Sequence, residues 1–294
     1  MYIRQAKWAA LAATAVLALS ACGNAGEEDK NPVNNAVEKN AASKFEDGTP
    51  MKALAEAGKI KIGVKYDQPG LGFKKAGDGI PVGFDVEMGK LIAAKLGIKA
   101  DDVEWVETIS DNREPFLQKG TVDLVIASYS ITPERRQVVG QAGPYYVTGQ
   151  QLLVKKGSDI KSVADVKGKE VCSVTGSTSL DQVKAKGAKT RGFETYSQCR
   201  DQVLDGAIGA MTTDGSILLG YAAENPDELE VVGDPFSTEN YGIGYAKDKP
   251  ELCQFVSKTI KGAQDDGDWA KAFEATLGKS GVETPAPPAM DACA

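Results

Sequence analysis

The sequence of 294 residues contains no histidine. Without an imidazole the chain cannot assemble, from its own residues, a Ser–His–Asp triad, a Cys–His pair or a His-ligated zinc or haem. It also has no G-x-x-x-x-G-K-[ST] loop, and its Gly242-Ile243-Gly244 run lacks the third glycine of a dinucleotide fingerprint. Most common enzyme chemistries are therefore disfavoured. We expect a protein that is not an enzyme and that uses no cofactor and no metal.

Positive charge is also scarce. Lys and Arg total 34 against 41 Asp and Glu, so the formal net charge is −7, and no stretch concentrates the basic residues. Nucleic-acid binding depends on neutralising phosphates, so it is not expected here. With 42% hydrophobic and 26% charged residues, the chain has enough material for one large or two medium domains.

The first 22 residues have the pattern of a secretory signal. Arg4 and Lys7 precede an apolar run from Trp8 to Leu19 that is too short to span a bilayer. The segment ends in Leu19-Ser20-Ala21-Cys22, which resembles the lipobox of bacterial lipoproteins. That resemblance implies a signal peptide over 1–22, lipidation of Cys22, and an extracytoplasmic protein anchored by lipid to the outer face of the cytoplasmic membrane. A plain signal peptide with an incidental cysteine is the alternative.

Residues 23–50 are rich in Asn, Glu, Lys, Ala and Gly. Their scattered apolar side chains cannot bury enough surface to offset the entropy lost on ordering, which predicts a flexible tether. A polar surface helix around Ala36 to Lys44 is the alternative interpretation.

Few cysteines are present, and none are spaced as C-x-x-C, so a zinc or redox motif is not expected. With Cys22 set aside, Cys172, Cys199, Cys253 and Cys293 allow three pairings in an oxidising compartment. We prefer nearest-neighbour pairing, Cys172–Cys199 and Cys253–Cys293, in which the second disulfide holds the Pro-rich tail against the body. Four buried free thiols are the alternative.

Beyond Met51, short β-branched runs alternate with amphipathic helical stretches, which indicates an α/β architecture. Asp85 is predicted to cap a helix whose apolar residues keep helical spacing up to Gly97. The predicted strands are 59–64, 122–127, 150–154, 170–174, 207–211 and 230–232.

Strand-to-helix junctions direct backbone N–H groups and a positive dipole end towards a ligand. In the first junction, from Ala127 to Arg135, Thr132 is a good N-cap and Pro133 suits the first helical position. Arg135 then lies in the first turn, where a cation opposes the helix dipole unless an anion is bound. A bidentate grip on a carboxylate fits this arrangement. The alternative is a salt bridge to a nearby acid such as Glu134.

Two further junctions complement the first. Val174–Ser179 combines small hydroxyl residues with one glycine, which lets the backbone approach an anion closely. Thr212–Gly215 places Asp214 either as an ordinary N-cap or as a carboxylate for an ammonium group. Together the three junctions offer a cation and hydrogen-bond donors for a carboxylate, and an anion for an amine. These groups are the complement of an α-amino acid.

From about Lys59 to Gly278 the chain resembles the type 2 periplasmic binding proteins of polar amino-acid ABC importers, most closely the glutamate-binding lipoproteins of actinobacteria. The runs that carry the resemblance are Asp67–Phe73, Gly83–Val86, Arg113–Gly120, Val122–Leu124, Ser130–Arg135, Gly143–Tyr146, Cys172–Thr178, Thr212–Asp214 and Tyr241–Gly244. Each motif is loose, but their order and spacing persist over most of the chain.

The resemblance implies how an amino acid is held. Arg135 grips the α-carboxylate, with backbone and hydroxyl groups of Ser128 and Ser130 beside it. Thr178 donates to the same carboxylate from the second lobe, and Asp214 accepts from the α-ammonium.

The resemblance also implies a pair of cations for an acidic side chain. These are Lys65, after the first strand, and Arg113, which starts a helix. Arg113 belongs to a run that begins at Ser110, and we include Ser110 among the ligand-binding residues. Two cations favour a γ-carboxylate over an amide, because an amide leaves them without a counter-charge. Some relatives have arginine at the position of Lys65, and lysine is the less geometrically demanding cation.

The fold implied is a two-lobed α/β Venus flytrap with two crossover hinge strands. The first lobe comprises 51–147 plus 239–294 and the second 148–238, with hinges near Tyr146–Gly149 and Ser237–Tyr241. Ligand binds one lobe and completes the site with the other, so closure follows from differential affinity for the closed state.

The function implied is a monomeric, lipid-anchored receptor that delivers L-glutamate to an ABC permease with its cytoplasmic ATPase. Binding of L-aspartate as well is left open. A glutamine- or asparagine-binding receptor is one alternative, and a sensor that signals to a kinase is another. A dehydratase on the same fold is disfavoured by the absence of histidine.

Overall fold

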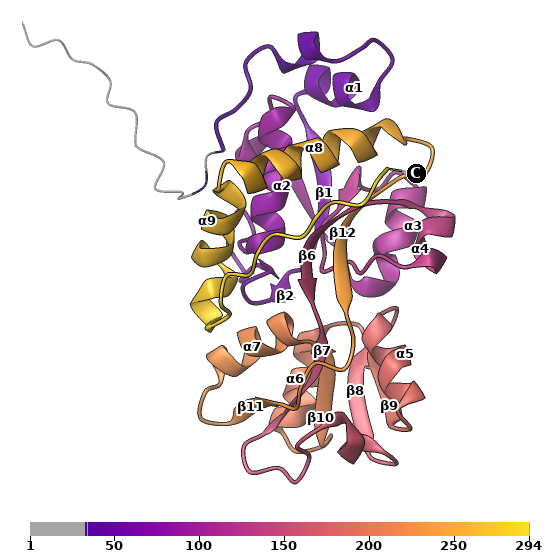
Figure 1. Cartoon of the computed structure of the whole chain (residues 1–294), viewed down its shortest axis with the longest axis vertical. Coiled ribbons are helices and arrows are strands. Elements are labelled where there is room, and N and C mark those ends of the chain that lie inside the picture. The colour runs from indigo at the N-terminus through magenta and orange to yellow at the C-terminus, as the bar shows by residue number, and fades with distance from the viewer. Residues whose placement is uncertain (1–32, 34, 294) are drawn as a thin grey trace, which may run out of the picture. The chain divides into compact units, whose positions relative to one another are not determined.

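The computed structural model describes residues 33 and 35–293 (Figure 1). The signal peptide predicted over 1–22 and the lipidation of Cys22 lie outside these residues. Among the helices described, none is long and apolar enough to cross a membrane.

The first lobe is built on a mixed sheet in the order β4-β1-β5-β12-β6. Strands β4, β1 and β5 are parallel, and β12 runs antiparallel to both β5 and β6. The strands are β1 (Ile60–Val64), β4 (Val103–Glu107), β5 (Leu124–Val125), β6 (Gly140–Thr148) and β12 (Glu239–Tyr245), with a hairpin of β2 (Asp67–Gln68) and β3 (Gly72–Phe73) beside them. The helices are α1 (Pro50–Ala57), α2 (Phe84–Lys95), α3 (Arg113–Gln118), α4 (Pro133–Val138), α8 (Glu251–Asp265) and α9 (Asp268–Ala275). Short 3-10 turns cover Ala41–Lys44, Ala100–Asp102, Ser110–Asn112 and Leu277–Ser280.

The second lobe has its own sheet, in the order β11-β7-β10-β8-β9. Its strands are β7 (Gln150–Lys155), β8 (Glu170–Val174), β9 (Lys189–Phe193), β10 (Ala210–Asp214) and β11 (Leu229–Val232). Helices α5 (Thr178–Ala185), α6 (Tyr196–Leu204) and α7 (Gly215–Glu224) accompany this sheet, with a 3-10 turn at Val163–Val166.

Two crossovers join the sheets, as in type 2 periplasmic binding proteins. The chain leaves the first sheet between β6 and β7 and returns between β11 and β12 (Figure 1). Glycine is required at the first crossover, because a Cβ on Gly149 would lie 2.5 Å from the carbonyl oxygen of Ser237 on the second. The two crossovers therefore lie against each other.

The second half of the predicted tether is part of the folded body, and the expectation of a flexible segment up to residue 50 is wrong there. Glu38 N–H donates to the Ala94 carbonyl at 2.8 Å, and Ala41 is buried. Phe45 packs edge-on against Phe255 with 5.6 Å between ring centroids. A few apolar side chains suffice because α2 and α8 supply the rest of the contact surface.

Helix α2 begins at Phe84 with Gly83 as its N-cap, so the predicted cap role of Asp85 is wrong. The Asp85 carboxylate instead accepts from Ser128 N–H at 2.8 Å and from the Tyr145 hydroxyl at 2.6 Å. Predicted strand 207–211 is also displaced, to Ala210–Asp214, because the chain turns around Gly206 and Gly209 first.

Both preferred disulfides are present. Cys172 in β8 is bonded to Cys199 in α6, and Cys253 in α8 is bonded to Cys293 near the end of the tail. Asp291 also fixes the tail, donating from its N–H to the Gly143 carbonyl at 2.6 Å and pairing with Arg136 at 2.7 Å.

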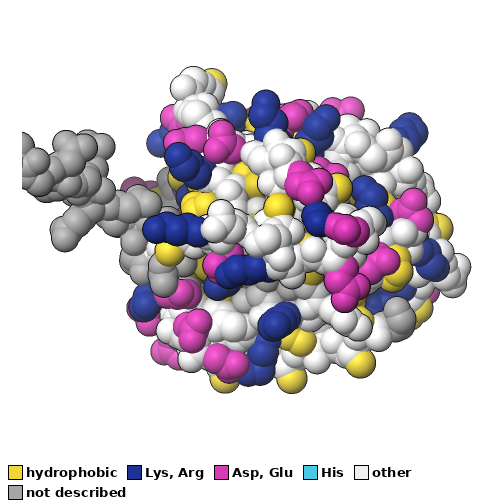
Figure 2. All heavy atoms as spheres, turned by 90° about the horizontal axis from the view of Figure 1, so that it is seen from above, with side chains coloured by type: hydrophobic (Ala, Val, Ile, Leu, Met, Phe, Trp, Pro, Cys, Tyr) yellow, Lys and Arg dark blue, Asp and Glu magenta, His cyan; other side chains and the backbone are white. Residues whose placement is uncertain are grey.

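On the face shown in Figure 2, acidic and basic side chains are interspersed, with hydrophobic side chains scattered between them. No large patch of one charge covers this face of the described residues.

Candidate ligand-binding site

Lys65 follows β1 directly and is 3% exposed. Its Nζ donates to Ser110 Oγ at 2.9 Å, and among the described residues it forms no ion pair. Burial, with the nearby charge of Arg113, lowers the pKa of Lys65 to about 7. Removing an ammonium from water without a counter-charge is unfavourable, so this lysine favours an anion beside it.

Arg113, at the start of α3, is 2% exposed. Its guanidinium donates to backbone carbonyls: Nε to Ser110 at 3.1 Å, Nη1 to Ala127 and Ser128 at 3.3 Å each, and Nη2 to Gly176 at 3.0 Å. None of these acceptors is charged. Burial and the charge of Arg135 lower the pKa of Arg113 to about 10.

Arg135 lies in α4, where Thr132 caps the helix and Pro133 takes the first position, as predicted. Its Nη1 donates to the Ser130 carbonyl at 2.8 Å, and its Nη2 donates to Gly176 at 3.0 Å. The acid that pairs with it is Glu114 at 3.1 Å and not the neighbouring Glu134.

Tyr129 lies between the two serines of this junction and contacts both arginines. Its ring centroid is 4.6 Å from Arg113 Cζ and 4.9 Å from Arg135 Cζ. Its hydroxyl donates to Glu114 at 2.8 Å, which links the ring to the acid of Arg135. The aromatic ring therefore holds two like charges close together and offsets part of their repulsion by cation–π attraction.

Ser128 has a left-handed backbone with φ of 42°, which turns the chain sharply after β5. Its N–H donates to Asp85, and its hydroxyl donates to Gln68 Oε1 at 2.9 Å. The Ser128 N–H expected beside a ligand carboxylate is thus engaged inside the protein in this arrangement. The amide Nε2 of Gln68 is buried without a hydrogen-bond partner among the described residues.

Thr178 begins α5 in the second lobe, after a turn that Ser177 caps. Its Oγ1 donates to Glu239 Oε2 at 3.1 Å and accepts from Gln150 Nε2 at 3.3 Å. Glu239 is buried at the start of β12 and accepts also from Gln150 at 2.8 Å and Ser237 at 3.0 Å. A hydroxyl has one hydrogen, so Thr178 donates to this acid or to a ligand.

Asp214 precedes α7 but does not cap it with its side chain. Its Oδ2 accepts from the Tyr241 hydroxyl at 2.5 Å, and its Oδ1 is buried without a partner among the described residues. Burial, and next the charge of Glu239, raise the pKa of Asp214 to about 7. This carboxylate favours a cation or a donor at Oδ1.

The predicted residues fall into three sets, two in the first lobe and one in the second. Lys65, Ser110, Arg113 and Ser128 form one hydrogen-bonded network in the first lobe. Arg135 and Ser130 form a second contact there, joined to Arg113 through Gly176 of the second lobe. Thr178 and Asp214 contact neither network directly by hydrogen bond, and belong to the second lobe.

Four residues of the site were missed by sequence reasoning: Gln68, Tyr129, Glu239 and Tyr241. Tyr129 stood inside a flagged junction between two predicted ligand residues and could have been included. Glu239 and Tyr241 lay in the predicted hinge, where an acid two residues before an aromatic was a usable sequence signal.

A hollow of about 400 Å³ opens elsewhere, at the hinge. It is lined from both crossovers, by Tyr146–Gly149, Gly215, Ser216 and Ser237 among others. None of the predicted ligand-binding residues lines it, so we do not place the ligand there.

Two α/β lobes, two crossovers and opposed charged groups define a two-lobed solute-binding protein of type 2. The sequence profile of the bacterial extracellular solute-binding proteins, family 3, matches residues 60–279, and the chain belongs to this family. The glutamate-binding protein GluB of Corynebacterium efficiens is 36% identical over 295 residues, covering 95% of this chain and 92% of that protein. The ABC transporter glutamine-binding protein GlnH of Bacillus subtilis is 34% identical over 263 residues, covering 88% and 92%. An ancestral arginine-binding protein solved with glutamine has a TM-score of 0.70 at 38% identity, covering 75% of this chain and 98% of that one.

Proposed function

We propose that the chain is the extracytoplasmic substrate-binding subunit of an ABC importer and that its ligand is L-glutamate. The observation that carries this proposal is the burial of two cations, Lys65 and Arg113, with no ion pair among the described residues. Buried charges are normally paired, because their desolvation is costly. A side-chain carboxylate satisfies both cations, whereas an amide cannot.

The remaining groups suit the backbone of an α-amino acid. Arg135 binds the α-carboxylate, and Thr178 supports it by turning its hydroxyl from Glu239 to the ligand. Asp214 accepts from the α-ammonium at Oδ1, the oxygen without a partner among the described residues. Ser128, Ser130 and Ser110 position the cations through the contacts described above.

Closure and delivery follow from the two-lobed fold. The ligand engages the first lobe, and the second lobe completes the site, so the ligand favours the closed state by its differential affinity. We propose that the lobes meet at residues 147/148 and 238/239, so that 148–238 form the second lobe. The closed receptor then docks on a permease, held near it by lipid at Cys22.

Isothermal titration of the full-length protein in a mild detergent tests this function, with glutamate, aspartate, glutamine and asparagine as ligands. We expect 1:1 binding of glutamate, with glutamine weaker by about tenfold, roughly 1.4 kcal/mol. Equal binding of acids and amides would refute the role of the two cations. The glutamine-binding relative makes glutamine the second candidate, and glutamine as the tighter ligand would select it.

A further inference from the structure

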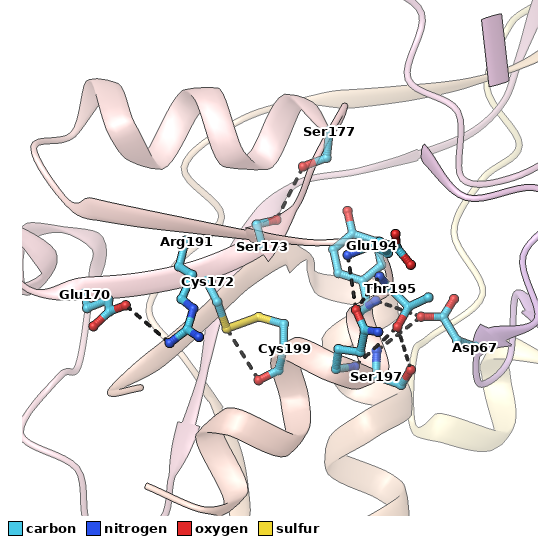
Figure 3. Close-up of a disulfide and its surroundings, with 12 residues drawn as sticks. Asp67, Glu170, Cys172, Ser173, Ser177, Arg191, Glu194, Thr195, Ser197 and Cys199 are labelled. Carbon is cyan, nitrogen blue, oxygen red and sulfur yellow. Dashed lines mark hydrogen bonds and ion pairs between the residues drawn. A yellow bond between two sulfur atoms is a disulfide. The ribbon is translucent and has the colours of Figure 1, made fainter. Parts of the chain in front are cut away.

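A contact between the lobes lies beside the charged residues of the proposed site, and its first-lobe partner, Asp67, acts electrostatically on Lys65. Asp67, in β2 of the first lobe, accepts at Oδ2 from the N–H of Tyr196 at 2.7 Å and of Ser197 at 3.1 Å. These are the first two residues of α6 in the second lobe. Figure 3 shows the Asp67 carboxylate reaching the start of this helix from a separate part of the chain.

The first four N–H groups of a helix have no partner within the helix. In α6, a capping box supplies two of the partners: Thr195 N–H donates to Gln198 Oε1 at 3.3 Å, and Gln198 N–H donates to Thr195 Oγ1 at 3.4 Å. Asp67 accepts from the other two, which belong to Tyr196 and Ser197. The helix therefore caps itself only in part, and the first lobe completes the cap with a negative charge at the positive end of the dipole.

The same hairpin meets α7 of the second lobe. The Tyr221 hydroxyl donates to the backbone carbonyl of Asp67 at 2.5 Å. Gly220 faces Pro69 so closely that a Cβ there would lie 2.5 Å from the Pro69 carbonyl oxygen. Backbone and side chain of one short hairpin thus fit two helices of the opposite lobe.

Both sides of this contact are held in place. On the second lobe, Cys199 in α6 is bonded to Cys172 in β8 (Figure 3). On the first lobe, the N–H groups of Phe84 and Asp85 donate to the carbonyls of Gly70 and Leu71, which fastens the hairpin to α2. The acceptor and its two donors are each fixed to their own lobe. Their contact can therefore form only when the lobes are close together.

We infer that Asp67 is a positioning residue that stabilises the closed state as a latch between the lobes. Its partners in the second lobe are the start of α6 and Tyr221. The inference rests on the proposed function in that ligand binding requires closure. A latch adds the same free energy to closure around any ligand, so its loss weakens every ligand by one factor. A ligand-contacting residue would change selectivity instead.

The test uses the full-length protein with Asp67→Ala, Tyr221→Phe and the double variant. Asp101→Ala, an exposed acid of the first lobe, is the matched control. Glutamate and glutamine affinities are measured by titration, and dissociation rates by stopped flow. We expect Asp67→Ala to weaken both ligands by about tenfold, through faster dissociation. The losses of affinity in the two single variants should not add in the double variant, because both substitutions remove parts of one contact.

If Asp67→Ala folds poorly, Tyr221→Phe still tests the latch. It removes one hydroxyl of the contact and no charge. Unchanged dissociation in both variants would overturn the latch. So would a loss confined to glutamate, since that would mean that Asp67 acts through the charge of Lys65.

If no amino acid binds, the proposed function fails. A distance measurement on the ligand-free protein then still tests whether Asp67 acts as a latch. Nitroxides at Lys99→Cys and Lys186→Cys, one exposed position on each lobe, report the distance between the lobes in the ligand-free protein. Asp67→Ala should shift that distance distribution towards longer distances. An identical distribution in wild type and variant would overturn the latch.

Discussion

Arg113 and Arg135 donate from their Nη2 atoms to one acceptor, the carbonyl oxygen of Gly176, at 3.0 Å each. The arginines belong to the first lobe and the glycine to the second, so a neutral carbonyl joins two cations across the lobes. A carboxylate carries a full negative charge and can accept two parallel N–H bonds from one guanidinium, so it binds arginine more strongly than a neutral carbonyl does. A ligand carboxylate therefore competes well for these donors.

Lys65→Met tests the acidic selectivity. Methionine keeps the unbranched length of the side chain and removes its charge, so only a ligand with a side-chain carboxylate loses an ion pair. We expect the Kd for glutamate to rise by about tenfold, roughly 1.4 kcal/mol, with little change for glutamine. Lys61→Met, at an exposed lysine in β1, the strand that Lys65 follows, is the control. An equal loss of affinity for both ligands would show that Lys65 does not bind the side-chain carboxylate.

Affinity for glutamate should be greatest near neutral pH. An anionic ligand needs protonated Lys65, and burial lowers the pKa of Lys65 to about 7, so affinity falls as pH rises above that value. An ammonium needs ionised Asp214, and burial raises the pKa of Asp214 to about 7, so affinity falls as pH drops below it. Titrations from about pH 5.5 to 8.5 measure both limbs.

The variant Lys65→Met is the control for the pH profile. It should lose the alkaline limb and keep the acidic one, because Asp214 is untouched. A flat profile in the wild-type protein would contradict the ionisation assigned to both groups.

The local parts of the site could be predicted from the sequence. Thr132, Pro133 and Arg135 stand within four positions, and the cap by Thr132 and the place of Pro133 at the helix start follow from rules that act over one helical turn. The binding of an anion by Arg135 stays a prediction. The strand at Glu170–Val174 was also predicted with its observed limits, because a short β-branched segment that ends just before a glycine turn is a strong strand signal.

Contacts between distant segments could not be predicted. Asp67 meets α6 at a separation of 129 residues, and Glu239 meets Thr178 at 61. Asp85 was given a cap role because it precedes an apolar helix, yet its carboxylate binds Ser128, 43 residues away. A short-range rule assigns a polar side chain to its nearest helix end, and tertiary packing overrides that choice.

The two disulfides should differ in their effect on ligand binding. Replacing Cys172 and Cys199 by serine removes a link across 27 residues and should lower the free energy of unfolding by roughly 3–4 kcal/mol in the chain-entropy model. Ligand affinity should also fall, because α6 receives Asp67. Serine at Cys253 and Cys293 should lower stability by a similar amount, since the separation is 40 residues, and should leave affinity unchanged. Urea unfolding and titration measure the two effects, and equal affinities in both double variants would contradict this assignment.

Gly220→Ala should separate the stability of the second lobe from its closure. Alanine is favoured over glycine inside a helix by about 1 kcal/mol, so α7 itself gains stability. The added Cβ would lie 2.5 Å from the carbonyl oxygen of Pro69 in the first lobe, so closure must be incomplete or the hairpin must move. We expect ligand affinity to fall by about tenfold while the thermal midpoint of the ligand-free protein stays equal or rises.

Gly262→Ala is the matched control for Gly220→Ala. Gly262 lies inside α8, and a Cβ there meets nothing within 4 Å, so the helix gains the same intrinsic preference without a clash between lobes. That variant should bind ligand as the wild type does. If Gly220→Ala also binds with unchanged affinity, Pro69 and α7 do not approach each other in the complex as they do in this structure, and the closed state is held by other contacts.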